Sequence, residues 1–171
     1  AKMLHPQEPV MSAPEEEVEQ LAMMSAQEGS ISPLEAQLVQ NVLRLNDVKA
    51  LDILTPRSVV FKLSAEKTIG EIREVVKEWK QSRIPIYEGE DAENWVGLVL
   101  ARDILTCLAQ DQFDRALRSL MRPLYFVPET AKGHDLLAEF LKKRSHLFGV
   151  LDEYGGIEGV VRIRIARLDG R

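Results

Sequence analysis

Hydrophobic positions follow two different spacings along the chain. Between residues 33 and 45, in PLEAQLVQNVLRL, leucine and valine recur at helical spacing, which predicts an amphipathic helix. Ser32 before this stretch and Glu35 within it form the capping-box pattern that starts a helix. After Val48 the spacing changes, and short apolar runs alternate with helical stretches. The pattern therefore predicts a helical beginning followed by a mixed region.

An acidic helix is predicted ahead of this one. Ser12 is its expected cap, Pro14 lies in its first turn, and Gly29 is expected to end it. Residues 1–11 mix Pro, Glu and Ser and are interpreted as a linker, whereas 12–47 are interpreted as a helical connector. A piece of a longer protein would begin in this way.

The mixed region contains one pattern twice. The strand GLVLARD at 97–103 has a counterpart in GVVRIRI at 159–165, and each follows an apolar run and a turn. Upstream, the helical stretch TIGEIREVVKEWKQS is matched by GHDLLAEFLKKRS, and SRIPIYEG is matched by SHLFGVLDEYGG. The repeat predicts a duplicated domain, because its period is longer than that of solenoid proteins.

The alignment sets Pro56 opposite Pro123 and the apolar pair 59–60 opposite 126–127. Each repeat reads as an extended segment, a helix, two strands and a closing helix, RDILTCLAQDQ in the first. An α+β fold is predicted, with two β-α-β-β-α repeats packed face to face after the N-terminal helices.

The expected bounds are 48–112 for the first repeat, 113–168 for the second and 169–171 for a tail. The second repeat is expected to be incomplete at its C-terminus, because RIRIARLDGR lacks the spacing of a closing helix. Truncation, an altered reading frame and natural divergence all remain open as explanations. Another chain would then have to cover the exposed apolar face, which favours a homodimer.

Composition narrows the function classes. The chain of 171 residues has 45% hydrophobic residues and a net charge of -5, which disfavours general binding of nucleic-acid phosphates. A single cysteine, Cys107, excludes an internal disulfide, and the three histidines have no zinc-site spacing. Apolar runs fall short of the roughly 18 to 20 residues that span a bilayer. We therefore expect a soluble fragment without a nucleic-acid partner.

Four motifs in order resemble a known family. The tandem pattern resembles a pair of CBS domains, the Bateman module. The motifs DILTPRSVV, SRIPIYEG and LDEYGG, with EGSISPLEAQLVQNVLRL before them, are similar to the CorC/HlyC hemolysin-like proteins, which are related to the cyclin-M magnesium transporters. The resemblance covers about residues 12–161.

The resemblance implies a regulatory module that binds an adenine nucleotide, AMP or ATP, with accompanying Mg²⁺ left open, and that forms dimers. It also implies a parent protein whose transmembrane domain precedes the pair, with the pair on the cytoplasmic side of the inner membrane. The activity implied for that parent is efflux of magnesium or cobalt. The preferred nucleotide, the ion and its direction stay open.

Asp103, at the end of the first repeated strand, is a candidate for binding the ribose hydroxyls. Its alternative role is to cap the helix that follows. Arg83 is expected to project opposite to Ile84 and to meet phosphate, and His146 is placed at the matching position of the second repeat. For both, an exposed strand residue is the alternative.

The remaining candidates are apolar walls and a turn. Thr55 and Arg57 flank Pro56 in LTPR, which can aim them at a ligand or can simply join two elements. The expected walls of the adenine slot, for which core packing is the alternative, are Ile84, Pro85, Leu147 and Phe148.

The resemblance implies that only one site is complete. In the family, Thr or Ser follows the strand and Asp comes three residues later, whereas this chain has Leu100 and Asp103 in the first repeat and Arg162 and Ile165 in the second. Ile165 cannot accept a hydrogen bond, and a lost charge-assisted pair costs about 1.5 to 3 kcal/mol. One nucleotide per chain, at Asp103, is expected.

Catalysis is not expected. Asp152 and Glu153 are neighbours in LDEYGG and would point to opposite faces of a strand, so they cannot act as an acid/base pair. Cys107 has apolar neighbours and no histidine near it in sequence. The leading hypothesis is a nucleotide-sensing regulatory module, and the alternative is a dimerisation or interaction module with empty clefts.

Overall fold

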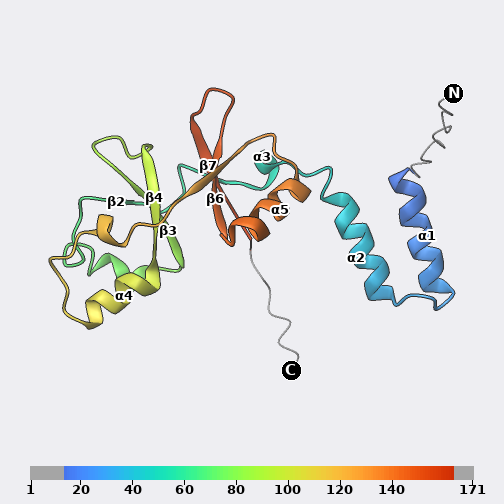
Figure 1. The fold of residues 1–171 in the computed structure, drawn as a ribbon, viewed down its shortest axis with the longest axis horizontal. Coiled ribbons are helices and arrows are strands. Elements are labelled where there is room, and N and C mark those ends of the chain that lie inside the picture. Colours follow the sequence, from blue (N-terminus) through green and yellow to red (C-terminus); the bar gives the residue numbers. More distant parts are fainter. Residues whose placement is uncertain (1–13, 164–171) are drawn as a thin grey trace, which may run out of the picture. The chain divides into compact units, whose positions relative to one another are not determined.

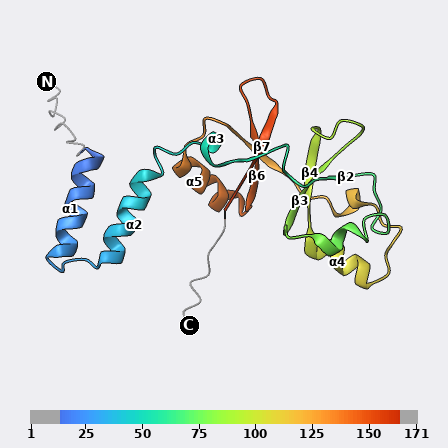
Figure 2. The same ribbon diagram turned by 180° about the vertical axis from the view of Figure 1, so that it is seen from behind.

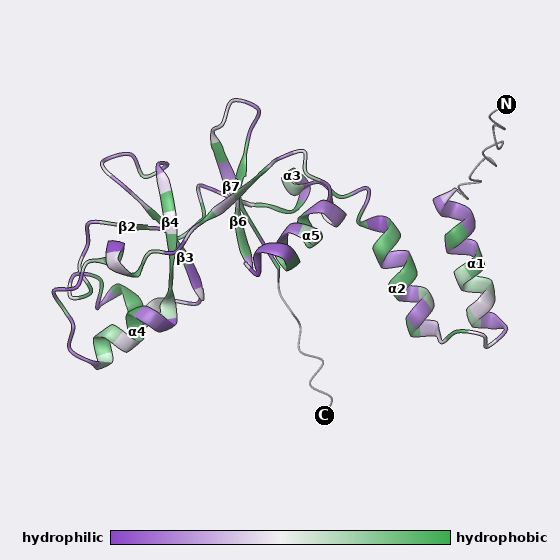
Figure 3. Cartoon of the chain, viewed as in Figure 1, coloured by the Kyte–Doolittle hydropathy of each residue, from purple (hydrophilic) through white to green (hydrophobic). Residues whose placement is uncertain are grey.

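A computed structural model describes residues 14–163, except for the side chains of 77 and 78. Its contacts divide the chain into one unit that ends at Asp47 and another that starts at Val48 (Figure 1). The first unit is a helical hairpin of α1 (Glu15–Gln27) and α2 (Pro33–Arg44). Hydrophobic and hydrophilic residues alternate along both helices (Figure 3).

Both ends of the hairpin turn have the predicted chemistry. Gly29 has φ +77 and its N–H donates to the Ala26 carbonyl, while the Ser30 N–H donates to that of Ser25 at 2.9 Å, so α1 ends in a Schellman motif. The Ser32 hydroxyl accepts from the Glu35 N–H at 3.2 Å, and the Glu35 carboxylate accepts from the Ser32 N–H at 2.7 Å. The predicted capping box is confirmed, whereas the predicted cap Ser12 lies outside the described residues.

The second unit contains two sheets. One has the order β2-β3-β4, formed by β2 (Leu63–Ser64), β3 (Arg83–Tyr87) and β4 (Trp95–Leu100). The other has the order β1-β7-β6-β5, formed by β1 (Thr55–Pro56), β5 (Tyr125–Pro128), β6 (Leu147–Leu151) and β7 (Ile157–Arg162). The predicted α+β class is confirmed.

Helices accompany both sheets. Helix α4 (Ala101–Ala109) follows β4, and α5 (Gly133–Lys143) connects the parallel strands β5 and β6 (Figures 1 and 2). Three short helical turns complete the unit, namely α3 (Ala50–Ile53), η1 (Val75–Glu78) and η2 (Leu117–Leu120).

The two hairpins have the same register. Ile86 pairs with Gly97 in β3–β4, and Val150 pairs with Gly159 in β6–β7, with an irregularity directly after each pair. The first repeat therefore superposes on the second with a shift of 64 residues in the first strand of the hairpin and 62 in the other. The predicted duplication is present in the structure.

The repeats exchange the segments that lead into them. Thr55 of the first leading segment pairs with Val160 in the second sheet, and Arg122 of the second leading segment pairs with Leu98 in the first sheet. The Leu98 N–H and the Arg122 carbonyl are 3.0 Å apart. Each repeat therefore completes the sheet of the other.

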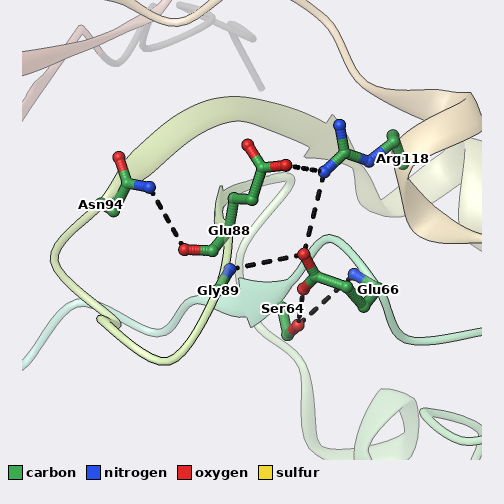
Figure 4. Close-up of polar contacts among 6 residues, drawn as sticks. All are labelled: Ser64, Glu66, Glu88, Gly89, Asn94 and Arg118. Carbon is green, nitrogen blue, oxygen red and sulfur yellow. Dashed lines mark hydrogen bonds and ion pairs between the residues drawn. The ribbon is translucent and has the colours of Figure 1, made fainter.

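Ion pairs hold one exchanged segment in place. Arg118 of η2 donates to the Glu88 carboxylate and lies 3.8 Å from that of Glu66, and both glutamates belong to the first repeat (Figure 4). These bonds raise the pKa of Arg118. The pKa of Glu66 is lowered, chiefly by the hydrogen bond from the Ser64 hydroxyl.

The exchange extends to the hydrophobic cores. The first core contains Leu117 from the second leading segment, next to Ile69, Ile84 and Ile86. The second core contains Ala50 from the first leading segment, together with Val127, Leu136, Phe140, Phe148, Val150 and Val161. A third cluster joins the faces between the sheets, through Trp95, Leu98, Leu124, Leu147 and Val160. This third cluster lies where the sequence predicts face-to-face packing.

The two repeated glycines are explained by this exchange. A Cβ on Gly97 would lie 2.8 Å from the Arg122 carbonyl oxygen, and a Cβ on Gly159 would overlap the Thr55 carbonyl oxygen. Each exchanged segment therefore passes over a position that has no room for a side chain.

Two sequence predictions need correction. Val60 corresponds to Leu124, not to Val127, because Val60 and Leu124 both pack in the third cluster. The counterpart of Val127 is Leu63. Leu63 pairs with Ile86 in the first sheet as Val127 pairs with Val150 in the second. The alignment missed three extra residues, 57–59, in the first repeat.

The helix predicted over TIGEIREVVKEWKQS is also wrong, because only the 3₁₀ turn η1 forms there. Gly70 and the β-branched Ile69, Ile72, Val75 and Val76 lower helix propensity. Ile69 and Ile72 are nevertheless buried in the first core.

Among residues 14–163, no helix is long and apolar enough to cross a membrane.

Candidate ligand-binding site between the repeats

A cavity of about 270 Å³ lies between the two repeats. Its walls come from the first leading segment, the residues before and within β3, and the facing strands of the second sheet. Apolar side chains on its walls are Val59, Val60, Phe61, Pro85, Leu147, Val160 and Ile163. The polar residues are Thr55, Lys80, Gln81, Ser82, Arg83, His146 and Arg162.

The cavity is strongly basic although the chain is acidic. Lys80, Arg83 and Arg162 line it, whereas no carboxylate is among its described lining residues. Within the described residues none of these three cations lies in an ion pair. Unpaired cations beside apolar walls favour an anionic ligand with an apolar part.

Strand alternation places Arg83 in the cavity. Ile84 and Ile86 point into the first core, so Arg83 and Pro85 face the other repeat. The pKa of Arg83 is lowered, first by partial burial and then by the positive charge of Arg102. A phosphate between the two guanidinium groups would relieve this repulsion.

A second hollow of about 450 Å³ adjoins the first. The two share four consecutive residues, 80–83. The second hollow is also lined by Trp79, the start of α4 at Ala101, and Arg102. The basic surface thus continues beyond the first cavity.

Five of the nine predicted site residues meet in the cavity, namely Thr55, Arg83, Pro85, His146 and Leu147. Ile84 and Phe148 do not, because they are buried in the first and second cores with 0% and 1% exposure. The alternative of core packing applies to these two, since their neighbours in each strand take the opposite face.

Arg57 is not among the residues that line the cavity. Its guanidinium donates to the Ile157 carbonyl at 2.8 Å and lies 3.8 Å from the Glu93 carboxylate. It therefore links the first leading segment to the hairpin loops of both repeats.

Asp103 is also outside the lining of both hollows. It lies in the first turn of α4, where its carboxylate accepts from Arg122 at 2.8 Å and lies 3.5 Å from the Arg102 guanidinium. It does not cap the helix, because the N-cap Leu100 has no side-chain cap bond and Asp103 lies inside the helix. The role of Asp103 toward a nucleotide stays a prediction.

The expected equivalence of Arg83 and His146 is wrong by one residue. Arg83 pairs with Leu100 and Leu147 pairs with Arg162, so Leu147 is the counterpart of Arg83. Ser82 is therefore the counterpart of His146. The cavity lies beside the end of β7, which is the second of the two repeated strands. The sequence analysis predicts that Ile165 weakens nucleotide binding at this end, but Ile165 lies outside the described residues.

Sequence reasoning missed Lys80 and Arg162 as cavity cations. Lys80 lies in an irregular segment that was expected to be helical, so its direction could not be inferred. In the sequence, Arg162 stands out only because it replaces the hydroxyl residue that follows the strand in the family. Its pairing with Leu147 at the end of the hairpin was the signal that could have found it.

Resident metal ligands are not apparent in the part of the chain that the structure describes, where no three His, Cys, Asp or Glu side chains gather in a metal-binding group.

The duplicated sheets, the exchanged leading segments and the cleft between the repeats define a tandem CBS pair, as the sequence motifs predicted. The structure matches the CBS domain of a bacterial CNNM/CorC family Mg²⁺ transporter with a TM-score of 0.77 and 30% identity, covering 88% of this chain and 92% of the other. The chain belongs to the CNNM/CorC family.

Further relatives agree. A UPF0053 protein of Synechocystis is 38% identical over 154 residues, covering 90% of this chain and 44% of that protein. The magnesium and cobalt efflux protein CorC of Escherichia coli is 31% identical over 126 residues, covering 74% of this chain and 43% of that protein. The chain thus spans less than half the length of these relatives. No family model matches the sequence.

One related structure carries a nucleotide. The CBS domain of a bacterial CNNM/CorC family Mg²⁺ transporter in complex with ATP has a TM-score of 0.69 and 30% identity, covering 76% of this chain and 92% of the other.

Proposed function

We propose that this CBS pair binds one adenine nucleotide, AMP or ATP, in the cavity between its repeats. The observation that carries the proposal is the set of three cations, Lys80, Arg83 and Arg162, which line the cavity and which, among the residues that the structure describes, have no ion-pair partner and no carboxylate beside them in the lining. They would meet the phosphates, and the apolar walls around Pro85 and Leu147 would hold the base. The nucleotide in a related CBS domain of the family supports this choice of ligand.

The proposed role is regulatory and not catalytic. In a longer parent protein, the pair would lie on the cytoplasmic side of the inner membrane, behind a transmembrane domain, and would sense the nucleotide. Efflux of magnesium or cobalt by the parent is proposed from the name of the CorC relatives. The bounds 48–112 and 113–168 are proposed for the two CBS repeats.

A homodimer is part of the proposal. Leu137 and Leu141 lie on one side of α5, four residues apart, and are 36% and 70% exposed. Exposed leucines in such a pair favour burial against another apolar surface. A second copy of this chain is the proposed partner.

Charge removal at the cavity tests the nucleotide. Arg83→Met and Arg162→Met each remove a cation that would bind phosphate while keeping an apolar stem. Because such a charge-assisted bond contributes about 1.5 to 3 kcal/mol, each variant should bind AMP or ATP roughly 10- to 150-fold more weakly. Isothermal titration with AMP, with ATP and with ATP plus Mg²⁺ measures the change.

Arg57→Met is the matched control, because Arg57 lies in the same leading segment but bonds to the Ile157 carbonyl. It should retain the wild-type affinity. Absence of binding by the wild-type chain at near-millimolar nucleotide would instead favour the dimerisation or interaction module. Binding that is unchanged in both cavity variants would place the nucleotide elsewhere.

A further inference from the structure

The second hollow has apolar walls that a nucleotide confined to the cavity would leave uncovered. The lining residues that it does not share with the cavity include Val76, Trp79, Leu100 and Leu105. Leu105 is 52% exposed, although it is a leucine on the wall of a hollow of about 450 Å³. Apolar and aromatic walls with a few polar groups between them are typical of ligand sites. The second hollow can therefore hold an apolar group of its own.

Positive charge lies at the boundary between the cavity and the second hollow. Lys80 and Arg83 line both, whereas Arg162 lines only the cavity and Arg102 only the second hollow. Among the described residues, Lys80 and Arg83 have no ion-pair partner, and the Arg102 guanidinium lies 3.5 Å from the Asp103 carboxylate. Phosphate groups would therefore be bound in the middle of the combined site, with apolar walls on either side.

Each side of this boundary has an aromatic side chain. Phe61 lines the cavity and Trp79 lines the second hollow. The two rings contact each other, with their centroids 5.7 Å apart and their planes tilted by 58°. Nucleic-acid bases pack favourably against aromatic side chains, because every base has an extended apolar face. The cavity and the second hollow thus each offer an aromatic residue to a base.

The start of α4 adds to the attraction for phosphate. Its first residue, Ala101, lines the second hollow, and its N-cap, Leu100, has no side-chain cap hydrogen bond. The N-terminus of a helix favours phosphate through its backbone N–H groups and its dipole. Together with Arg102, this end of α4 therefore favours a phosphate chain that extends out of the cavity.

The volumes also favour a ligand that extends beyond the cavity. The cavity, at about 270 Å³, is slightly smaller than typical ligand pockets, which measure roughly 300 to 1,000 Å³. With the second hollow, of about 450 Å³, the combined site falls well within this range.

We infer that the cavity and the second hollow together bind a dinucleotide, in which two nucleosides are joined through their phosphates. One base occupies the cavity, the phosphates meet Lys80 and Arg83, and the second base lies against Trp79 and Leu105. This inference rests on the proposed binding of an adenine nucleotide in the cavity and specifies the class of ligand that the site takes.

Two ligands that differ by one nucleoside test the inference. Diadenosine tetraphosphate and adenosine tetraphosphate have the same phosphate chain, but only the first carries a second adenosine. Because that adenosine would cover the apolar walls around Trp79, diadenosine tetraphosphate should bind at least about tenfold more tightly. Isothermal titration of the full chain measures both affinities, and one diadenosine tetraphosphate per chain is expected.

Leu105→Ser locates the second nucleoside. A base in the second hollow would bury the exposed part of Leu105, so the serine variant should bind diadenosine tetraphosphate about three- to tenfold more weakly. Its affinity for adenosine tetraphosphate should stay within about twofold of the wild type, because that ligand leaves the apolar wall uncovered.

Leu51→Ser is the matched control. Leu51 is 50% exposed on α3 and lines neither the cavity nor the second hollow, so both affinities should be retained. Thermal unfolding shows whether each variant is folded. If Leu105→Ser is unfolded, Trp79→Leu removes the aromatic wall and gives the same comparison.

The outcomes separate the two proposals. Equal affinities of the wild type for the two tetraphosphates overturn the dinucleotide site and leave the proposed function intact. An advantage of diadenosine tetraphosphate that persists in the folded wall variant also overturns it, because the second nucleoside would then lie outside the second hollow. Half a ligand per chain would do the same, since the dinucleotide would join two chains. No binding of these ligands, of AMP or of ATP removes the proposed function and this inference together.

Discussion

At the scale of single residues, equivalent positions of the two repeats can have the same role or opposite ones. Gly97 and Gly159 are alike because each must admit a carbonyl of an exchanged segment. Pro85 and Gly149 occupy equivalent positions but have opposite effects, since one offers a wall and the other admits Phe126. The identical glycines of the two repeats therefore reflect a requirement of folding. The pair that differs, Pro85 and Gly149, changes which side chain lies on that face of the strand.

The glycine contact predicts a large loss of stability on substitution. In Gly159→Ala the new Cβ would overlap the Thr55 carbonyl, so β1 must shift or detach from β7. The free energy of unfolding should fall by at least about 1 to 3 kcal/mol, the usual cost of overpacking. Thermal and denaturant unfolding measure it.

Gly70→Ala is the matched control. Its Cβ would lie 3.3 Å from the nearest atoms of Phe113, so a small shift accommodates it. Equal losses in the two variants would mean that the approach of Thr55 to β7 is not what requires glycine.

At the scale of elements, local chemistry explains which predictions hold. The capping box at Ser32 and the turn at Gly29 could be predicted, because each depends on residues a few positions apart. The helix expected before β3 does not form, because its apolar spacing is helical whereas its β-branched residues and Gly70 oppose a helix. Periodicity alone cannot weigh these two effects.

The site was only partly predictable for a related reason. Thr55, Arg83 and Pro85 follow from motifs, but Lys80 lies in an irregular segment whose direction no pattern gives. Asp103 was correctly placed in the first turn of a helix, yet its pairing with Arg122 depends on the exchange of segments. When a leading segment joins the sheet of the other repeat, its contacts are with residues far away along the sequence. The spacing of residues within a motif does not reveal such contacts.

The loop around Glu66 gives a prediction about pH. Its pKa is lowered chiefly by the Ser64 hydroxyl, so the folded state binds its proton less tightly than the unfolded state. The resulting stabilisation is present above the ordinary pKa of a glutamate and is lost as the pH falls through the lowered value.

Ser64→Ala should therefore raise the pKa of Glu66 toward its ordinary value, as followed by carbon NMR of the carboxyl group. Arg118→Met should raise it less, because the charge of Arg118 is the smallest of the causes. A pKa that responds only to Arg118→Met would contradict this ranking.

At the scale of the whole molecule, the folding units differ from the sequence repeats. The first core needs Leu117 and Leu120, which lie beyond residue 112. The segment 57–122 contains every residue of this core, whereas 48–112 lacks these two. The exchange thus shifts each folding unit along the chain.

Fragments test this shift. The fragment 57–122 should show a more cooperative thermal unfolding transition than 48–112, because only the former can close the first core. Circular dichroism at equal concentration compares them. A sharper transition for 48–112 would mean that the leading segment at Ala50 stabilises its own repeat and not the other.

The exchanged first segment also sets a path for mechanical load. Val48 directly follows the helical hairpin in sequence, and its carbonyl accepts from the Gly133 N–H at 2.8 Å. Tension applied at residue 47 is therefore carried first into the second repeat, through Val48 and Ala50, and reaches Thr55 on the cavity wall within a few residues. A force on the hairpin therefore acts on the second repeat before it acts on the first.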